Sequence, residues 1–238
     1  MPASIRAFAD DSTDPRVRGF LHTPETPNRS ALVLTHGAGS NSQAPLLIAV
    51  ADAFCTAGFT VLRCDLPYRQ SRSYGPPGPG DAARDRAGLK NAIAAMKKML
   101  LGGPSSRPSQ SHGSIYLGGH SYGGRQASML CAEQPEDAPE LVPGLLLLSY
   151  PLHPPRKPEQ QRTQHLPDLH TPTLFVQGTR DPFGTIAELE QARKMIPGKT
   201  KLLVVEGGGH DLGFKGKARR EELPQEVLLA FHQLVSQP

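Results

Sequence analysis

The fold follows from one stretch, Leu117-Gly118-Gly119-His120-Ser121-Tyr122-Gly123-Gly124-Arg125. Residues 114–117, which lead into it, are apolar and predict a buried strand. Residues 125–133, which follow it, are helix formers with an apolar face. A strand that turns into a helix through Gly-x-Ser-x-Gly strains the serine backbone, and the flanking glycines let strand and helix approach. The pattern predicts a Ser121 hydroxyl lifted clear of a sheet at a helix N-terminus, where developing negative charge is favoured.

Strands and helices alternate on both sides of this turn. The sequence predicts strands over residues 17–21 (an edge strand), 31–35, 59–63, 114–117, 145–149, 173–177 and 201–205, and helices over 45–57, 81–101, 125–133, 186–196 and 221–235. This alternation predicts an α/β fold, with a mostly parallel, doubly wound sheet and helices on both faces. A loop is expected over 69–80, and the five prolines of residues 150–169 oppose long helices, so no large cap domain is expected. The length suits a single domain over residues 1–238.

Candidate catalytic side chains lie where the predicted strands end, which is where such sheets bind ligands. A serine hydroxyl needs a base within hydrogen-bond reach, and His210 follows the last strand behind three glycines. Asp181, in the turn after the 173–177 strand, is the leading candidate for the carboxylate that orients this base, and Glu206 is the reserve. The order Ser121, Asp181, His210 is a known chain order for such triads. The alternative interpretation is an ordinary surface histidine and a common turn aspartate before proline.

The turn after the 31–35 strand supplies a candidate hydrogen-bond donor for the negative charge that develops during acyl transfer. We expect the backbone N–H of Ala38 and that of Tyr122, which follows the nucleophile, to form an oxyanion hole. His36 is expected to brace this turn rather than to touch substrate.

A substrate pocket is expected around the same strand ends. Its candidate residues are His36, Gly37, Tyr68, Arg69 and Arg125. Positive charge from Arg69, Arg72 and Arg125 near the mouth would favour an acidic acyl group. The simpler interpretation, and the preferred one, is that these are solvated surface arginines.

Composition and charge exclude several other classes of function. The net charge of +4 is mild, and the basic run at residues 215–220 lacks interleaved aromatics, so a solvated loop is expected there and no nucleic-acid partner. The absence of a signal-peptide pattern or a long apolar run predicts a cytoplasmic protein with no membrane partner. Cys55, Cys64 and Cys131 are expected to be buried free thiols. Neither ligand spacing nor a dinucleotide fingerprint is present, so we expect no metal and no organic cofactor.

These motifs together resemble the α/β-hydrolase superfamily over nearly the whole chain. The likeness rests on His36-Gly37, Asp65-Leu66-Pro67, the Gly-x-Ser-x-Gly turn, Gly178-Thr179-Arg180-Asp181 and Gly208-Gly209-His210. Residues 149–155 and 174–184 resemble a smaller branch, which includes a eukaryotic testis-expressed hydrolase-like protein and a subunit of the NSL chromatin complex. Dienelactone hydrolases are a more distant likeness, with cysteine in place of Ser121.

The resemblance implies serine hydrolase machinery and names no substrate. With the triad candidates it predicts an esterase that acts through an acyl-enzyme on a small or medium ester. Two alternatives stay open. One is a peptidase or acyltransferase with the same triad, and the other is a non-catalytic hydrolase-like scaffold or binding protein.

Overall fold

A computed structural model describes residues 4–101, 113–135, 140–214 and 221–236 of the chain. The strands are β1 Ser4–Asp10, β2 Val17–Thr23, β3 Ala31–Thr35, β4 Thr60–Cys64, β5 Ile115–His120, β6 Leu145–Leu148, β7 Thr173–Gly178 and β8 Thr200–Val205. The helices are α1 Pro45–Thr56, α2 Pro67–Ser71, α3 Asp81–Leu101, α4 Tyr122–Ala132, α5 Ile186–Arg193 and α6 Leu223–Val235, with a short 3-10 helix, η1, at Leu166–Asp168. The strand order is β1-β2-β4-β3-β5-β6-β7-β8, so the predicted mostly parallel α/β sheet is confirmed.

The chain forms two compact units, Met1–Leu117 and Gly118–Pro238, and β5 passes from the first into the second. A single domain over residues 1–238 therefore stays a prediction. All three candidate triad residues belong to the second unit, and the turn that contains Ala38 belongs to the first.

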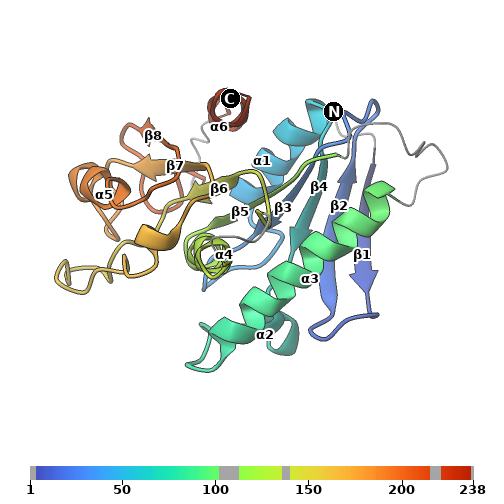
Figure 1. The fold of residues 1–238 in the computed structure, drawn as a ribbon, viewed down its shortest axis with the longest axis horizontal. Helices are drawn as coiled ribbons and strands as arrows, with labels where there is room; N and C mark the ends of the chain where they lie inside the picture. Colours follow the sequence, from blue (N-terminus) through green and yellow to red (C-terminus); the bar gives the residue numbers. More distant parts are fainter. Residues whose placement is uncertain (1–3, 102–112, 136–139, 215–220, 237–238) are drawn as a thin grey trace. The chain divides into compact units, whose positions relative to one another are not determined.

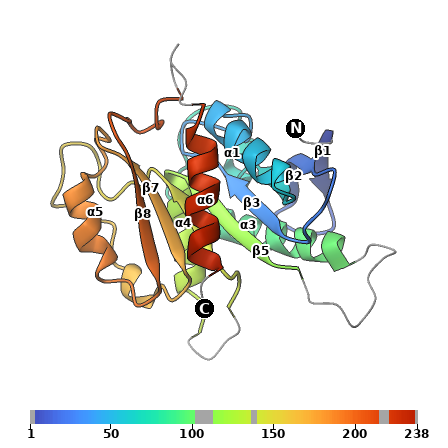
Figure 2. The same ribbon diagram turned by 90° about the horizontal axis from the view of Figure 1, so that it is seen from above.

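In the first unit, a parallel pair of fully buried strands forms the core. β3 pairs with β4 from Ala31 opposite Thr60 to Thr35 opposite Cys64. Figures 1 and 2 show α1 and α3 on opposite sides of these strands. The amphipathic pattern of residues 81–101 predicted α3 with its observed bounds, because a 21-residue helix repeats its apolar spacing many times.

In the second unit, β6, β7 and β8 run parallel, and β6 and β7 are buried along their whole length. α4 and α6 lie on opposite sides of these strands (Figures 1 and 2). Residues 150–169 cross from β6 to β7 with only η1 as regular structure. The prediction of no large cap domain is therefore confirmed for this crossing.

Two elements differ from the predictions. The prediction that residues 17–21 form an edge strand is wrong, because β2 lies between β1 and β4 and is antiparallel to both. β1 itself gave no signal because its side chains are mostly exposed, and Ile5 is 47% exposed. The predicted loop at 69–80 begins inside α2, whose five residues are too few to repeat an apolar spacing.

Candidate active site

Ser121 sits in a strained backbone conformation between β5 and α4. Its φ is 52° and its ψ is −118°, and it is the N-cap residue of α4. A side chain at Gly119 would place Cβ 2.6 Å from the Gly124 nitrogen, and one at Gly124 would place it 2.6 Å from the Gly119 oxygen. Only glycine at both positions lets the end of the strand and the first turn of the helix meet so closely. The Ser121 N–H donates to the Leu148 carbonyl at 2.8 Å, which fixes the turn to β6.

Three side chains of the second unit form a continuous hydrogen-bonded chain. His210 Nε2 lies 2.8 Å from Ser121 Oγ. On the other side of the ring, His210 Nδ1 lies 3.0 and 2.9 Å from the two Asp181 carboxylate oxygens. A carboxylate accepts, so we assign the ring proton to Nδ1, which leaves Nε2 as the acceptor of the serine proton. The structure thus brings together the three residues that the sequence proposed as nucleophile, base and orienting acid.

Asp181 is held rigidly in its turn. Its side chain is fully buried, and one oxygen also accepts a hydrogen bond from the Phe183 N–H at 2.9 Å. The turn itself is tied to the segment before His210, since Arg180 N–H donates to the Gly208 carbonyl at 2.8 Å and Gly207 N–H donates to Thr179 Oγ1 at 2.8 Å. These bonds set the distance between acid and base through the backbone.

Glu206 occupies a different place at the end of β8. Its Oε1 accepts a hydrogen bond from Thr179 Oγ1 at 3.3 Å. Both Asp181 oxygens contact the His210 ring, so we take Asp181 as the partner of His210 and Glu206 as a support of the turn.

Two neighbours of His210 were not identified from the sequence. The Phe183 ring lies against the imidazole, with ring centroids 4.1 Å apart. The His120 ring donates from Nε2 to the His210 backbone carbonyl at 2.7 Å. His120 fills the variable position of Gly-x-Ser-x-Gly, so no motif could assign it this contact. Phe183 comes close only through the turn that carries Asp181.

A second serine–histidine contact in this unit has a different character. Ser128 Oγ lies 2.8 Å from His165 Nε2, but Ser128 is fully buried in α4 and its hydroxyl donates to the Arg125 carbonyl at 2.9 Å. A hydroxyl that is enclosed and bonded within its own helix is not placed to attack a substrate. This contact attaches α4 to the segment that leads into η1.

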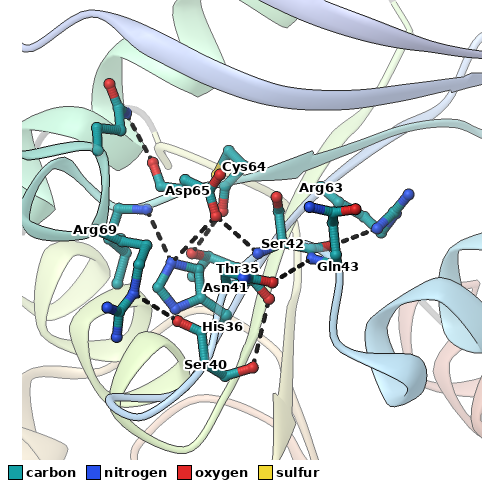
Figure 3. A network of polar contacts seen from close by, with 12 residues as sticks. Thr35, His36, Ser40, Asn41, Ser42, Gln43, Arg63, Cys64, Asp65 and Arg69 are labelled. Atoms are coloured by element: carbon teal, nitrogen blue, oxygen red, sulfur yellow. Dashed lines mark hydrogen bonds and ion pairs between the residues drawn. The ribbon is translucent and has the colours of Figure 1, made fainter. Parts of the chain in front are cut away.

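In the first unit, His36 is the centre of a polar network (Figure 3). The ring is fully buried; Nδ1 lies 2.9 Å from the Gly37 carbonyl and Nε2 accepts from the Leu66 N–H at 3.1 Å. Burial lowers the pKa of His36, so its neutral form is favoured. Asp65 joins the same network by accepting the Ser42 N–H at 2.7 Å. These contacts fit the bracing role expected for His36.

Tyr68 and Arg69 fix the same turn from α2. The Tyr68 hydroxyl donates to the carbonyls of Ala38 at 2.8 Å and Gly37 at 3.3 Å. Arg69 donates to the carbonyls of Ala38 at 3.1 Å, Ser40 at 2.8 Å and Gly75 at 2.9 Å. Burial raises the pKa of Tyr68 to about 12, so the hydroxyl keeps its proton.

These bonds also orient the Ala38 N–H. The Gly37 carbonyl is held by His36 and Tyr68, and in a trans peptide the N–H of the next residue points the opposite way. The Ala38 N–H is therefore turned away from the side chains that brace the loop. The pairing of this N–H with that of Tyr122 in an oxyanion hole stays a prediction.

The arginines of the predicted pocket differ in their surroundings. Arg69 is buried, so its interpretation as a solvated surface residue is wrong. Arg72 is exposed and forms an ion pair with Asp81. Arg125 is half-buried on the first turn of α4. A pocket lined by His36, Gly37, Tyr68, Arg69 and Arg125 stays a prediction.

Other expectations concern thiols, membranes and basic charge. The three cysteines are free and buried as predicted, and burial raises the pKa of Cys55 to about 11 and those of Cys64 and Cys131 to about 12. Within the described ranges, every helix is too short or too polar to cross a membrane. The basic run at 215–220 lies outside the described residues.

Comparisons with known proteins agree with this architecture. A dienelactone hydrolase from Anabaena variabilis superposes with a TM-score of 0.70 at 21% identity, over 98% of each chain. Est1E from Butyrivibrio proteoclasticus gives 0.68 at 15% identity, over 97% of this chain and 99% of its own. XC6422 from Xanthomonas campestris, described as an α/β serine hydrolase without lid, gives 0.64 at 15% identity, over 100% and 98%. The model of the alpha/beta hydrolase domain (Abhydrolase_11) matches residues 28–236, and the chain therefore belongs to the α/β-hydrolase family.

Proposed function

We propose that this protein is a serine hydrolase that cleaves a small or medium carboxylic ester. The observation that carries the proposal is the hydrogen-bonded chain from Ser121 Oγ through His210 to the buried Asp181. A base within 2.8 Å of the hydroxyl, itself oriented by a carboxylate, is the arrangement that activates a serine for acyl transfer. The strained conformation of Ser121 presents its hydroxyl at the start of α4.

The reaction divides into two steps that share the same residues. In the first, Ser121 Oγ attacks the ester carbonyl carbon while its proton passes to His210 Nε2. Asp181 stabilises the imidazolium, which then gives that proton to the leaving alcohol oxygen as the ester C–O bond breaks. In the second step, His210 takes a proton from water, the hydroxide attacks the acyl carbon, and the acid leaves as the proton returns to Ser121.

Negative charge develops on the carbonyl oxygen in both steps. The proposal assigns its stabilisation to the Tyr122 N–H, at the start of α4, and to the Ala38 N–H. Donors of this kind contribute on the order of 10²–10³ in rate each.

Two further observations support the proposal. Est1E, which shares the fold, has a solved structure with bound ferulic acid, a carboxylic acid of the size expected for an ester product. The three reduced cysteines fit a protein of the cytoplasm, where we infer that it acts.

We also infer one domain over residues 1–238 and membership of the branch with the testis-expressed and NSL-complex proteins, from residues 149–155 and 174–184.

A fluorophosphonate probe tests the nucleophile directly, because it reacts with activated serines. Wild-type protein should be labelled at Ser121 and should hydrolyse short p-nitrophenyl esters. Ser121→Ala should lose both properties, with turnover reduced on the order of 10⁶-fold. Ser128→Ala, which removes the other histidine-bonded serine, should keep labelling and turnover.

The same experiment separates the alternatives. Labelling with turnover of anilides but not of esters would favour a peptidase, and labelling with acyl transfer to an added alcohol would favour an acyltransferase. A folded protein that neither reacts with the probe nor turns over any ester would contradict the proposal and favour a scaffold or binding protein.

A further inference from the structure

Two arginines of the second unit, Arg125 and Arg162, are close enough for their charges to interact, and among the described residues neither has an acidic partner. Arg125 is one turn into α4, and its N–H donates to the Ser121 carbonyl at 2.9 Å. Arg162 lies in the segment between β6 and β7, where its Nη1 donates to the Pro151 carbonyl at 3.2 Å. Among the described residues, neither guanidinium is within ion-pair distance of a carboxylate.

A series of contacts connects the two arginines. Ser128, three residues after Arg125 and so on the same face of α4, contacts His165 at 2.8 Å. The Tyr150 hydroxyl is 3.5 Å from the same His165 nitrogen and donates to the Arg162 carbonyl at 3.0 Å. The face of α4 that carries Arg125 is therefore the face that the 150–169 segment covers.

Burial makes this charge arrangement unusual. The Nε atom of Arg125 is enclosed and has no hydrogen-bond partner within the described part of the chain. Burial lowers the pKa of Arg162, and the charge of Arg125 lowers it further. Burial likewise raises the pKa of Tyr150 to about 12, so its hydroxyl stays protonated and supplies no anion to either arginine. Two like charges on partly buried side chains repel one another, and an anion bound between them would relieve that repulsion.

We propose that Arg125 and Arg162 form a subsite for a carboxylate carried by the substrate. A guanidinium fork matches a carboxylate in geometry and binds it with charge-assisted hydrogen bonds. The Cα atoms of Ser121 and Arg125 are about 6 Å apart along the helix, and helical side chains lean toward the N-terminus. The subsite therefore selects an acyl chain with a free acid a few carbons beyond the ester carbonyl, as in the half-ester of a dicarboxylic acid.

This inference rests on the proposed function, because it names the substrate class of the same site. The test compares two esters with five-carbon acyl chains, p-nitrophenyl hemiglutarate and p-nitrophenyl valerate, which differ in the terminal carboxylate. Wild type should have at least a tenfold lower KM for the hemiglutarate, and added salt should reduce this preference.

Variants assign the preference to the two arginines. Arg125→Gln and Arg162→Gln should each raise the KM for hemiglutarate about tenfold and change that for valerate less than twofold. Arg156→Gln removes an exposed arginine of the same segment and should leave both values unchanged. Equal losses on both esters would overturn the inference, because they indicate damage to the segment rather than a lost charge contact. Turnover of valerate without preference for hemiglutarate would overturn it while leaving the hydrolase proposal intact.

A binding measurement keeps the inference testable without turnover. Glutarate should raise the Tm of the wild-type protein but not that of Arg125→Gln, and pentanol should raise neither. Equal stabilisation by inorganic phosphate would overturn the assignment to a carboxylate. Absence of any glutarate effect on wild type would overturn the subsite altogether.

Discussion

The ring of Phe183 covers the ring of His210, with centroids 4.1 Å apart and planes inclined by 32°. The same residue donates its backbone N–H to Asp181 at 2.9 Å, so it contacts two members of the proposed triad. Phe183 thus restricts the imidazole from one face while the Asp181 carboxylate fixes its in-plane direction.

Removing the Phe183 ring should leave the His210 imidazole in place but less well oriented. An aromatic contact of this kind is worth about 0.5–1.5 kcal/mol, so we expect Phe183→Ala to lower kcat roughly three- to tenfold with little change in KM. Phe183→Tyr should restore most of the loss, which a steady-state comparison of the two variants will measure. An unchanged kcat in Phe183→Ala would show that the ring has no positioning role.

The strained backbone at Ser121 should lower the stability of the fold, and two inactive variants can measure by how much. Ser121→Gly and Ser121→Ala both remove the hydroxyl and should be equally inactive. Glycine adopts a φ of 52° without a steric penalty, so Ser121→Gly should unfold with a free energy about 1 kcal/mol higher than Ser121→Ala. Urea denaturation of the two variants gives the comparison, and a less stable Ser121→Gly would argue against strain.

The orienting acid can be assigned by a matched pair of amides. Asp181→Asn should reduce kcat on the order of 10³–10⁴-fold, because the amide cannot hold the imidazole in the required tautomer or stabilise its charge. Glu206→Gln should change kcat by less than about threefold, since its observed contact is with Thr179. A larger loss in Glu206→Gln than in Asp181→Asn would exchange their roles.

Stability should fall in mild acid because of a buried histidine outside the site. His22 is enclosed in the first unit; its Nε2 accepts from Arg63 Nε at 2.7 Å and its Nδ1 faces Asp52 at 3.1 Å. Burial, with the charge of Arg63, lowers the pKa of His22 to about 4. The unfolded chain then binds the proton first, so the stabilisation is complete above about pH 6.5 and is lost as the pH falls toward 4.

The size of this effect can be measured by urea unfolding at pH 7.5 and pH 5. We expect His22→Asn to reduce the pH-dependent loss by on the order of 1–2 kcal/mol. Part of the loss should persist, because burial lowers the pKa of His36 in the same direction. An identical pH dependence in wild type and His22→Asn would contradict the prediction.

Access to the site should not require a lipid surface. Residues 150–169, which connect β6 to β7, contain only η1 as regular structure. We therefore expect activity on a short-chain ester to follow one hyperbolic saturation curve in dissolved substrate, with no jump at the solubility limit. An abrupt increase once droplets form would reveal a cover over Ser121.

The sequence predicted the parts of the molecule that obey local rules. Long amphipathic spacing predicted α3, and buried β-branched and leucine runs predicted β3 and β6. The elbow motif and the strand ends identified Ser121, Asp181 and His210. β1 was missed because an exposed outer strand has no buried face to produce a pattern.

The supporting contacts of the site were beyond sequence reasoning for a different reason. Phe183 and His120 act on His210 through positions that neither spacing nor composition marks. The half-buried position of Arg125 was not predicted either, because the 150–169 segment that covers its helix face is irregular. Such contacts depend on the conformations of irregular loops, and the apolar periodicity of the sequence carries no information about those conformations.

The 150–169 segment is closed at its base by a hydrogen bond from the Arg162 N–H to the Leu152 carbonyl at 2.8 Å. Residues 155–160, which lie between Leu152 and Arg162 in the chain, are exposed throughout. Lengthening this stretch would cost little, because the entropy of closing a loop grows only slowly with its length. Insertions at this point would leave the hydrogen bonds of Ser121, His210 and Asp181 unaltered, because none of them involves residues 155–160. Grafted peptides there offer a route to new substrate ranges on an unchanged hydrolytic centre.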